Sequence, residues 1–189
     1  MEEISADCIV FWMRQIFELL VVGNRSKNFG FFDPRLLTTY DGEEMATTRL
    51  KDRLMVASEN ELLFVPWNLK NHWMLCLVDT QKKEIYFMDS ISKPIRPIMK
   101  RILSQAMKAA YETKRTNQKI SPKWVTVKSP KQPGDVECGY FISHYIKDVV
   151  NADNPLQFLK GEFSELKTYS PSQIDKFRNE WAAELLKFV

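Results

Sequence analysis

A cysteine stands at position 138, in the stretch QPGDVECGYFISHYI, directly after a polar turn and before an apolar run. Apolar residues recur at three- and four-residue steps after Cys138, which predicts a helix that begins near this cysteine. The positive end of a helix stabilises a thiolate, the form of cysteine that attacks carbonyl carbons. Cys138 is therefore a candidate nucleophile, although on this evidence alone a buried structural cysteine explains the position equally well.

A thiolate nucleophile needs a base, and the base needs a group that orients it. The chain has two histidines. His144 lies six residues past Cys138 on the expected helix, turned away from the sulfur, and we interpret it as a surface or edge histidine. His72 stands where a loop enters the apolar run HWMLCLVD, and Asp89 closes the next run, IYFMD. If the two runs pair as a hairpin centred between residues 80 and 81, Asp89 lies opposite His72 and can hold its imidazole.

Two further residues complete the candidate chemistry. Gln132 precedes Cys138 by six residues across the polar turn. Its side-chain amide, together with the backbone N–H of Cys138, is suited to donate hydrogen bonds to an oxyanion. Gly139 leaves the approach to the sulfur open. Taken alone, Gln132 reads as a solvated loop residue and His72 as a solvated strand end, so it is their combination that is specific.

The elements that position these residues follow from periodicity and turn signals. The segment from Asn24 to Glu44 is turn-rich and is expected to be irregular apart from a short turn. Pro66 is expected to end the first strand. Helices are predicted over residues 5–22, 43–55, 98–114 and 138–150 and from Ser170 onward, and strands over 62–65, 72–79, 84–89 and 124–128. Helices at both ends of a small antiparallel sheet indicate an α+β fold in a single domain, residues 1–189.

Composition narrows the class of protein. Three widely separated cysteines form no disulfide framework, which indicates a reducing, intracellular compartment, and two histidines without close cysteines argue against a zinc site. No apolar run is long enough to span a bilayer, and the first residues lack the pattern of a secretory signal. Residues 93–131 hold eleven Lys or Arg and one acid. We interpret this segment as a solvated helix face followed by a basic loop. Few aromatic residues accompany the charges, and proteins that bind single-stranded nucleic acid use aromatic residues to stack on the bases.

The motifs VPWN, HWMLCLVD, IYFMDS and QPGDVECGYF, in this order, resemble the ubiquitin-like-protein proteases. This family contains the SUMO-specific (sentrin-specific) cysteine proteases and is related more distantly to adenovirus protease. The resemblance covers most of the chain and implies a papain-like fold with the catalytic residues in circularly permuted order. It implies that His72 is the general base, Asp89 its orienting acid, Cys138 the nucleophile and Gln132 part of the oxyanion hole.

The same resemblance implies a function and a substrate channel. The expected reaction is cleavage after the C-terminal Gly-Gly of a ubiquitin-like modifier, with SUMO as the expected modifier, in precursor processing or deconjugation. Trp73 would cover a channel so narrow that only glycine passes beneath the indole, with Gly139 beside it. The resemblance implies no cofactor, no metal, no membrane and no nucleic acid partner, and a monomer in the nucleus or cytoplasm.

The chain departs from the family pattern near its start. SUMO-specific members carry a Trp-Leu-x-Asp sequence just before the first helix, where this chain has residues 3–6, EISA. The departures resemble those of divergent plant and mobile-element members, and they leave open which modifier is recognised. Trp67 stands where the family more often has a smaller residue. It either rebuilds the channel wall or belongs to the core.

Two alternatives remain open at this point. Related bacterial effectors use a similar set of residues as acyltransferases, but they more often carry glutamate where this chain has Asp89. A binding domain that has lost catalysis would grip a modifier or a nucleic acid through the basic segment. The presence of all four chemical residues argues against such a loss.

Overall fold

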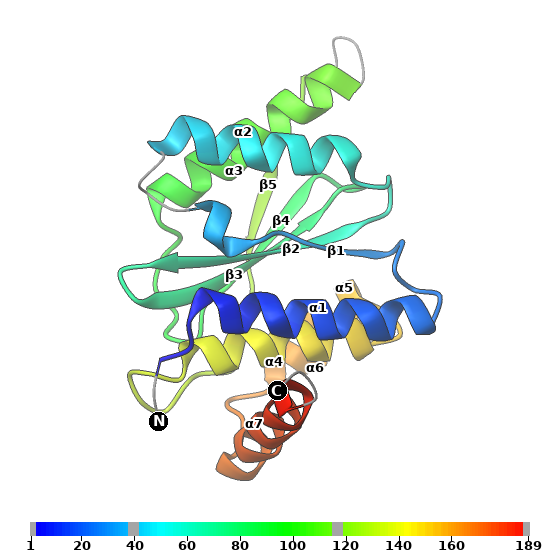
Figure 1. The fold of residues 1–189 in the computed structure, drawn as a ribbon. Coiled ribbons are helices and arrows are strands. Elements are labelled where there is room, and N and C mark those ends of the chain that lie inside the picture. Colours follow the sequence, from blue (N-terminus) through cyan, green and yellow to red (C-terminus); the bar gives the residue numbers. More distant parts are fainter. Residues whose placement is uncertain (1–2, 38–41, 115–118, 187–189) are drawn as a thin grey trace.

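The computed structural model describes residues 3–37, 42–114 and 119–186, and a five-stranded sheet with helices on both faces organises them (Figure 1). The strands lie side by side in the order β1-β2-β3-β4-β5. The two outer pairs, β1 with β2 and β4 with β5, are parallel, and the two inner pairs are antiparallel. The elements in chain order are α1 (Ala6–Val22), β1 (Phe29–Phe31), η1 (Pro34–Leu37), α2 (Gly42–Val56), β2 (Leu62–Leu69), β3 (His72–Asp79), β4 (Glu84–Met88), α3 (Pro97–Lys114), β5 (Lys123–Thr126), α4 (Cys138–Asn151), α5 (Pro155–Lys160), α6 (Glu162–Glu165) and α7 (Pro171–Leu185).

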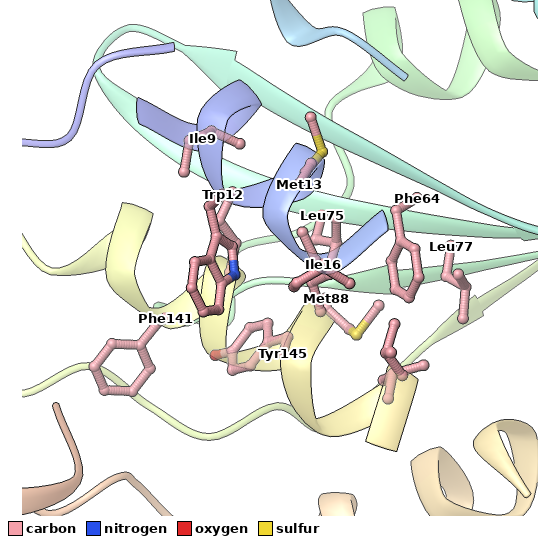
Figure 2. Close-up of a cluster of buried hydrophobic side chains, with 14 of the residues drawn as sticks. Ile9, Trp12, Met13, Ile16, Phe64, Leu75, Leu77, Met88, Phe141 and Tyr145 are labelled. Atoms are coloured by element: carbon pink, nitrogen blue, oxygen red, sulfur yellow. The ribbon is translucent and has the colours of Figure 1, made fainter. Parts of the chain in front are cut away.

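The sheet separates two hydrophobic clusters. Helices α2 and α3 cover one face, and α1 and α4, with the C-terminal helices beside them, cover the other (Figure 1). On the α1/α4 face, Trp12 and Ile16 of α1 and Phe141 and Tyr145 of α4 pack against sheet residues such as Leu75 (Figure 2). Alternate residues of β3 enter the two clusters, as expected for a strand covered on both sides. Helix α4 is consequently held against the sheet from its first turn onward.

The sequence-based elements are largely confirmed, and the α+β class with them. Strand 72–79 matches in full, and the helices agree within one or two residues. One prediction is wrong: Pro66 does not end its strand, because β2 continues to Leu69. Strand β1 stops opposite Phe64, so Pro66 lies beyond it on an unpaired edge where its missing N–H is tolerated. The short strand β1 and the short helices α5 and α6 were not predicted.

Candidate active site

A two-residue turn delivers His72 to the site. Strands β2 and β3 pair up to Leu69 and His72, and Lys70 and Asn71 between them have φ values of 53° and 61°. Positive φ at both positions is typical of the type I′ turn, whose twist matches that of the paired strands. Asparagine tolerates this conformation better than most residues. His72 is therefore fixed at the very first position of a strand whose remaining residues are all buried.

Asp89 meets His72 in a register that differs from the predicted one. The observed pairs of β3 and β4 include Asp79 with Glu84 and Leu75 with Met88, so Asp89, one residue past β4, is not directly opposite His72. The expected hairpin centre is thus wrong by one residue, and the two side chains are offset by two positions along the ladder. An offset of two keeps them on the same side of the sheet, within diagonal reach. The Nε2 atom of His72 lies 2.6 Å from Oδ1 of Asp89.

The Asp89 carboxylate is held from several directions. Its side chain is 2% exposed, and its oxygens accept hydrogen bonds from the backbone N–H groups of Ile91 (3.1 Å) and Lys93 (2.8 Å). Burial by itself lowers the pKa of His72. Hydrogen bonds and charge interactions with Asp89 and Cys138 together outweigh burial and raise this pKa to about 9. The imidazolium form of His72 is consequently favoured at neutral pH beside the two acidic groups.

Cys138 occupies the first position of α4. The Sγ atom lies 3.9 Å from the backbone carbonyl oxygen of Asn71, so the turn that carries His72 also contacts the sulfur. Glu137 precedes the helix, and its side chain makes no capping hydrogen bond to the first turn. The backbone N–H groups of that turn can therefore stabilise the negative charge of a Cys138 thiolate. With His72 bonded to Asp89 through Nε2, the Nδ1 side of the ring is left for the sulfur.

Gln132 is oriented by two partners. Ser90 donates its hydroxyl hydrogen to Oε1 of Gln132 (2.5 Å), and Nε2 of Gln132 donates to the carbonyl of Gly134 (2.7 Å). The backbone N–H of Gln132 donates to the carbonyl of Ser90 (3.1 Å). The amide has a second N–H, for which the described residues provide no acceptor. By donating to Oε1, Ser90 fixes the orientation of the Gln132 amide and so the direction in which its N–H groups point. This role of Ser90 was not predicted from the sequence.

Trp73 is held by the segment that leads into α1. Its indole N–H donates to the carbonyl of Ile4 at 2.9 Å, and the side chain is 2% exposed. A Cβ atom on Gly139 would lie 2.9 Å from Cβ of Ile4 and 3.3 Å from Cδ1 of Trp73. Ile4, Trp73 and Gly139 are therefore packed without spare room beside Cys138. Nothing in the type of residue 4 marks it for this role, because its contribution is a backbone carbonyl and a close contact.

This packing predicts the effect of Gly139→Ala. The added methyl group must displace Ile4 or Trp73, so we expect stability to fall by about 1–3 kcal/mol and KM to rise for a substrate that has to pass this contact to reach Cys138. Urea unfolding and steady-state kinetics measure the two effects. Gly23→Ala is the matched control, because a Cβ there meets nothing closer than 3.4 Å. A Gly139→Ala protein with unchanged stability and KM would show that the contact has room to relax.

Trp67 and His144 lie outside the site. Trp67 is 2% exposed and lies in the cluster under α2 and α3, whereas Trp73 lies in the cluster on the other face of the sheet. The packing of Trp67 therefore favours the interpretation that it is a core residue. His144 is not a surface histidine as predicted but is 8% exposed, stacked on Tyr169 at 4.1 Å between ring centroids and packed on Phe177. The prediction was wrong because the C-terminal segment folds back over α4, which helix periodicity cannot reveal.

Among the described residues, no three His, Cys, Asp or Glu side chains gather in a way that would hold a metal ion. In the same part of the chain no helix has the length and apolar character required to cross a membrane. All three cysteines are free, and burial raises the pKa of the Cys76 thiol well above its ordinary value.

Comparison with known proteins identifies the family. A model of the Ulp1 protease family, C-terminal catalytic domain, matches residues 38–187. The chain belongs to this family. Human sentrin-specific protease 2 is 28% identical over 133 residues, which make up 68% of this chain and 20% of that protein. The chain thus spans about a fifth of the length of the curated relatives that it matches.

Solved structures of other proteins share the fold. The protease domain of Ulp1, solved in complex with Smt3, the yeast ortholog of SUMO, superimposes with a TM-score of 0.59 at 24% identity, covering 82% of this chain and 69% of that one. XopD of Xanthomonas campestris, solved bound to ubiquitin, gives a TM-score of 0.65 at 16% identity, with coverage of 96% and 91%. The papain-like fold expected from the sequence is thereby confirmed.

Proposed function

We propose that the chain is a cysteine protease and isopeptidase that cleaves after the C-terminal Gly-Gly of a ubiquitin-like modifier, with SUMO as the modifier. The observation that carries the proposal is the 2.6 Å contact of His72 with Asp89 at the helix end where Cys138 stands. Membership of the Ulp1 protease family supports the same reaction. Precursor processing and deconjugation both use this chemistry, because each breaks an amide bond to the same terminal glycine.

The mechanism assigns a role to each group. The Cys138 thiolate attacks the carbonyl carbon of the terminal glycine, and the backbone N–H of Cys138 with the free N–H of Gln132 stabilises the oxyanion. The imidazolium of His72 gives its proton to the departing amine as the C–N bond breaks, which leaves a thioester. His72, now neutral, takes a proton from water, and the resulting attack releases the modifier's carboxylate and the Cys138 thiolate. Asp89 holds the ring through both steps.

The remaining assignments complete the proposal. Trp73 covers the glycine tail and Gly139 supports the indole, whereas Trp67 contributes to the core. The chain acts as one catalytic domain over residues 1–189, as a monomer, without a cofactor or a nucleic acid partner. Its three free cysteines suit the reducing nucleus or cytoplasm. The relatives named for SUMO or sentrin favour SUMO, and the XopD complex makes ubiquitin the second modifier to test.

The test is a panel of modifiers whose C-terminal glycine carries a vinyl-sulfone electrophile. SUMO and ubiquitin forms are incubated with the wild-type chain and with Cys138→Ala, and covalent adducts are read by gel shift and mass spectrometry. We expect a SUMO adduct on Cys138 that the variant lacks. An adduct with ubiquitin alone would show that ubiquitin, and not SUMO, is the modifier. Labelling of the Cys138→Ala protein would show that Cys138 is not the nucleophile. An acetylated Cys138 after incubation with acetyl-CoA, without any modifier adduct, would favour an acyltransferase.

The oxyanion role of Gln132 predicts a defined kinetic loss. We expect Gln132→Ala to lower kcat by roughly 10²-fold, the loss typical of removing one oxyanion donor, with a smaller change in KM. Ser90→Ala should give a weaker loss in the same direction, because it leaves the amide in place but unoriented. Stopped-flow or steady-state hydrolysis of a modifier–fluorophore conjugate measures both. A Gln132→Ala enzyme with normal kcat would remove this residue from the mechanism.

A further inference from the structure

The loop between β5 and α4 carries Gln132, and hydrogen bonds hold its backbone from two sides. The N–H of Gln132 donates to the carbonyl of Ser90 in the segment after β4, at 3.1 Å. The carbonyl of Pro130 accepts a hydrogen bond from the side-chain hydroxyl of Tyr145. This second bond comes from α4, the helix that begins at Cys138. The loop of the proposed oxyanion donor is therefore tied directly to the helix of the proposed nucleophile.

Tyr145 also meets the group that orients the Gln132 amide. It lies seven residues past Cys138, close to two full turns of helix, so the two residues face the same side of α4. Its ring is buried among the side chains between α4 and the sheet (Figure 2). Ser90, whose hydroxyl donates to Oε1 of Gln132 at 2.5 Å, is a hydrogen-bonding neighbour of the Tyr145 side chain. One phenol thus contacts both supports of Gln132, its loop and its orienting serine.

The Tyr145 hydroxyl keeps its proton at neutral pH and remains a donor. Burial raises the pKa of Tyr145 well above its ordinary value, and the charges of Asp89 and Asp148 act in the same direction. Pro130 is buried, and a buried carbonyl that loses its donor is costly to leave unpaired. Removing the hydroxyl therefore favours a shift of the loop toward another donor, and Gln132, two residues further along, would shift with it.

Building on the proposed function, we propose that Tyr145 is a positioning residue for the oxyanion hole. Its hydroxyl fixes the loop of Gln132 against α4, and therefore the place of the Gln132 amide relative to the backbone N–H of Cys138. Both donors must reach one oxyanion, so a shift of the loop weakens stabilisation of the transition state more than binding of the substrate. Tyr145 touches no reacting atom in this assignment and acts through Gln132.

The first test is the effect of Tyr145→Phe on hydrolysis of a SUMO–aminomethylcoumarin conjugate. We expect kcat to fall by roughly tenfold, with KM within about twofold, because the amide is retained but displaced. Tyr169→Phe is the matched control, since it removes another buried tyrosine hydroxyl, one that donates to the Asp148 carboxylate at 2.6 Å. Both variants should lose thermal stability to a similar extent, but Tyr169→Phe should keep the wild-type kcat.

A double-mutant cycle separates positioning from a general structural effect. If Tyr145 acts through Gln132, Tyr145→Phe should lower kcat by at most about twofold in a Gln132→Ala background, because the donor that it positions is already absent. A loss of roughly tenfold in both backgrounds would show that Tyr145 acts on kcat by another route. That result, or a normal kcat in Tyr145→Phe alone, would overturn the proposal.

A further readout needs no substrate and so separates this inference from the proposed function. In an isotopically labelled chain the side-chain amide of Gln132 gives a pair of N–H signals by NMR, identified by their loss in Gln132→Ala. We expect Tyr145→Phe to shift or broaden this pair and Tyr169→Phe to leave it in place. Unchanged signals in Tyr145→Phe would overturn the positioning role even where hydrolysis stands. If the signals respond but the wild-type chain hydrolyses no modifier conjugate, the proposed reaction is wrong, whereas the positioning of Gln132 by Tyr145 stands.

Discussion

Cys138→Ala is expected to hydrolyse a SUMO–fluorophore conjugate at least roughly 10⁴-fold more slowly than the wild-type chain, because loss of a nucleophile removes the covalent path entirely. The expected affinity for the modifier is unchanged or higher, since the alanine side chain is smaller and neutral. Steady-state hydrolysis measures the first effect, and isothermal titration with free modifier measures the second. The protein should remain folded, because the change removes a single sulfur at the edge of the core.

Cys8→Ala is the matched control for this experiment. Cys8 is partly exposed, whereas Cys76 and Cys138 are buried, and it lies on α1 with its sulfur accepting a hydrogen bond from the Ser5 hydroxyl. Its substitution should leave hydrolysis within about twofold, as expected of a side chain remote from the reacting atoms. If Cys138→Ala kept the wild-type rate and Cys8→Ala were inactive, the nucleophile would be Cys8 on α1. The proposed mechanism would then be wrong.

Asp89→Asn is expected to lower kcat by roughly 10³- to 10⁴-fold, as when the orienting acid of a comparable triad is neutralised. The amide keeps the shape of the side chain but no longer stabilises the imidazolium. It also presents an N–H where His72 needs an acceptor. Binding of the modifier should change little, because Asp89 is buried behind His72. Asp135→Asn, in the exposed loop before Cys138, is the control and should retain activity.

The same variant changes the pH profile in a direction fixed by charge. The pKa of His72 is about 9 in the folded protein, so the wild-type rate should fall as pH rises through about 9 and the imidazolium loses its proton. Removing the Asp89 charge lowers the pKa of His72, which moves this alkaline limb to lower pH. Single-turnover acylation by a modifier amide substrate between pH 6 and 10 measures the limb, because this step needs the proton that His72 gives to the leaving amine. A limb that stays at the wild-type pH would show that Asp89 does not hold the imidazole charge.

Much of the site could be predicted because its signals are local. The strand that begins at His72 has a continuous apolar pattern, and Cys138 begins an apolar periodicity with a polar turn before it. What the sequence could not supply was contact between distant segments. The register of β3 and β4 depends on the turn from Asp79 to Glu84, in which Asp79 accepts hydrogen bonds from two backbone N–H groups and Lys83 has a positive φ of 58°.

Two further differences have the same origin. The burial of His144 depends on Tyr169 and Phe177, which arrive from a part of the chain more than 20 residues later. The support of Trp73 by Ile4 joins residues 69 apart through a backbone carbonyl, for which any residue type would serve as acceptor. Patterns within one segment reveal which face is apolar, but they do not reveal which segment will cover it.

The separation of the core into two clusters has a consequence for how substitutions act. Cys138 and Trp73 belong to the cluster on the α1/α4 face, whereas Trp67 and Cys76 are buried in the cluster under α2 and α3. A damaging change in that layer should leave each folded molecule as fast as before and reduce how many molecules are folded. A loss of about 1–2 kcal/mol can change abundance in a cell severalfold. Substitutions in the α2/α3 layer would therefore change the amount of folded enzyme in a cell. Substitutions in the α1/α4 layer would change the rate at which each folded molecule works.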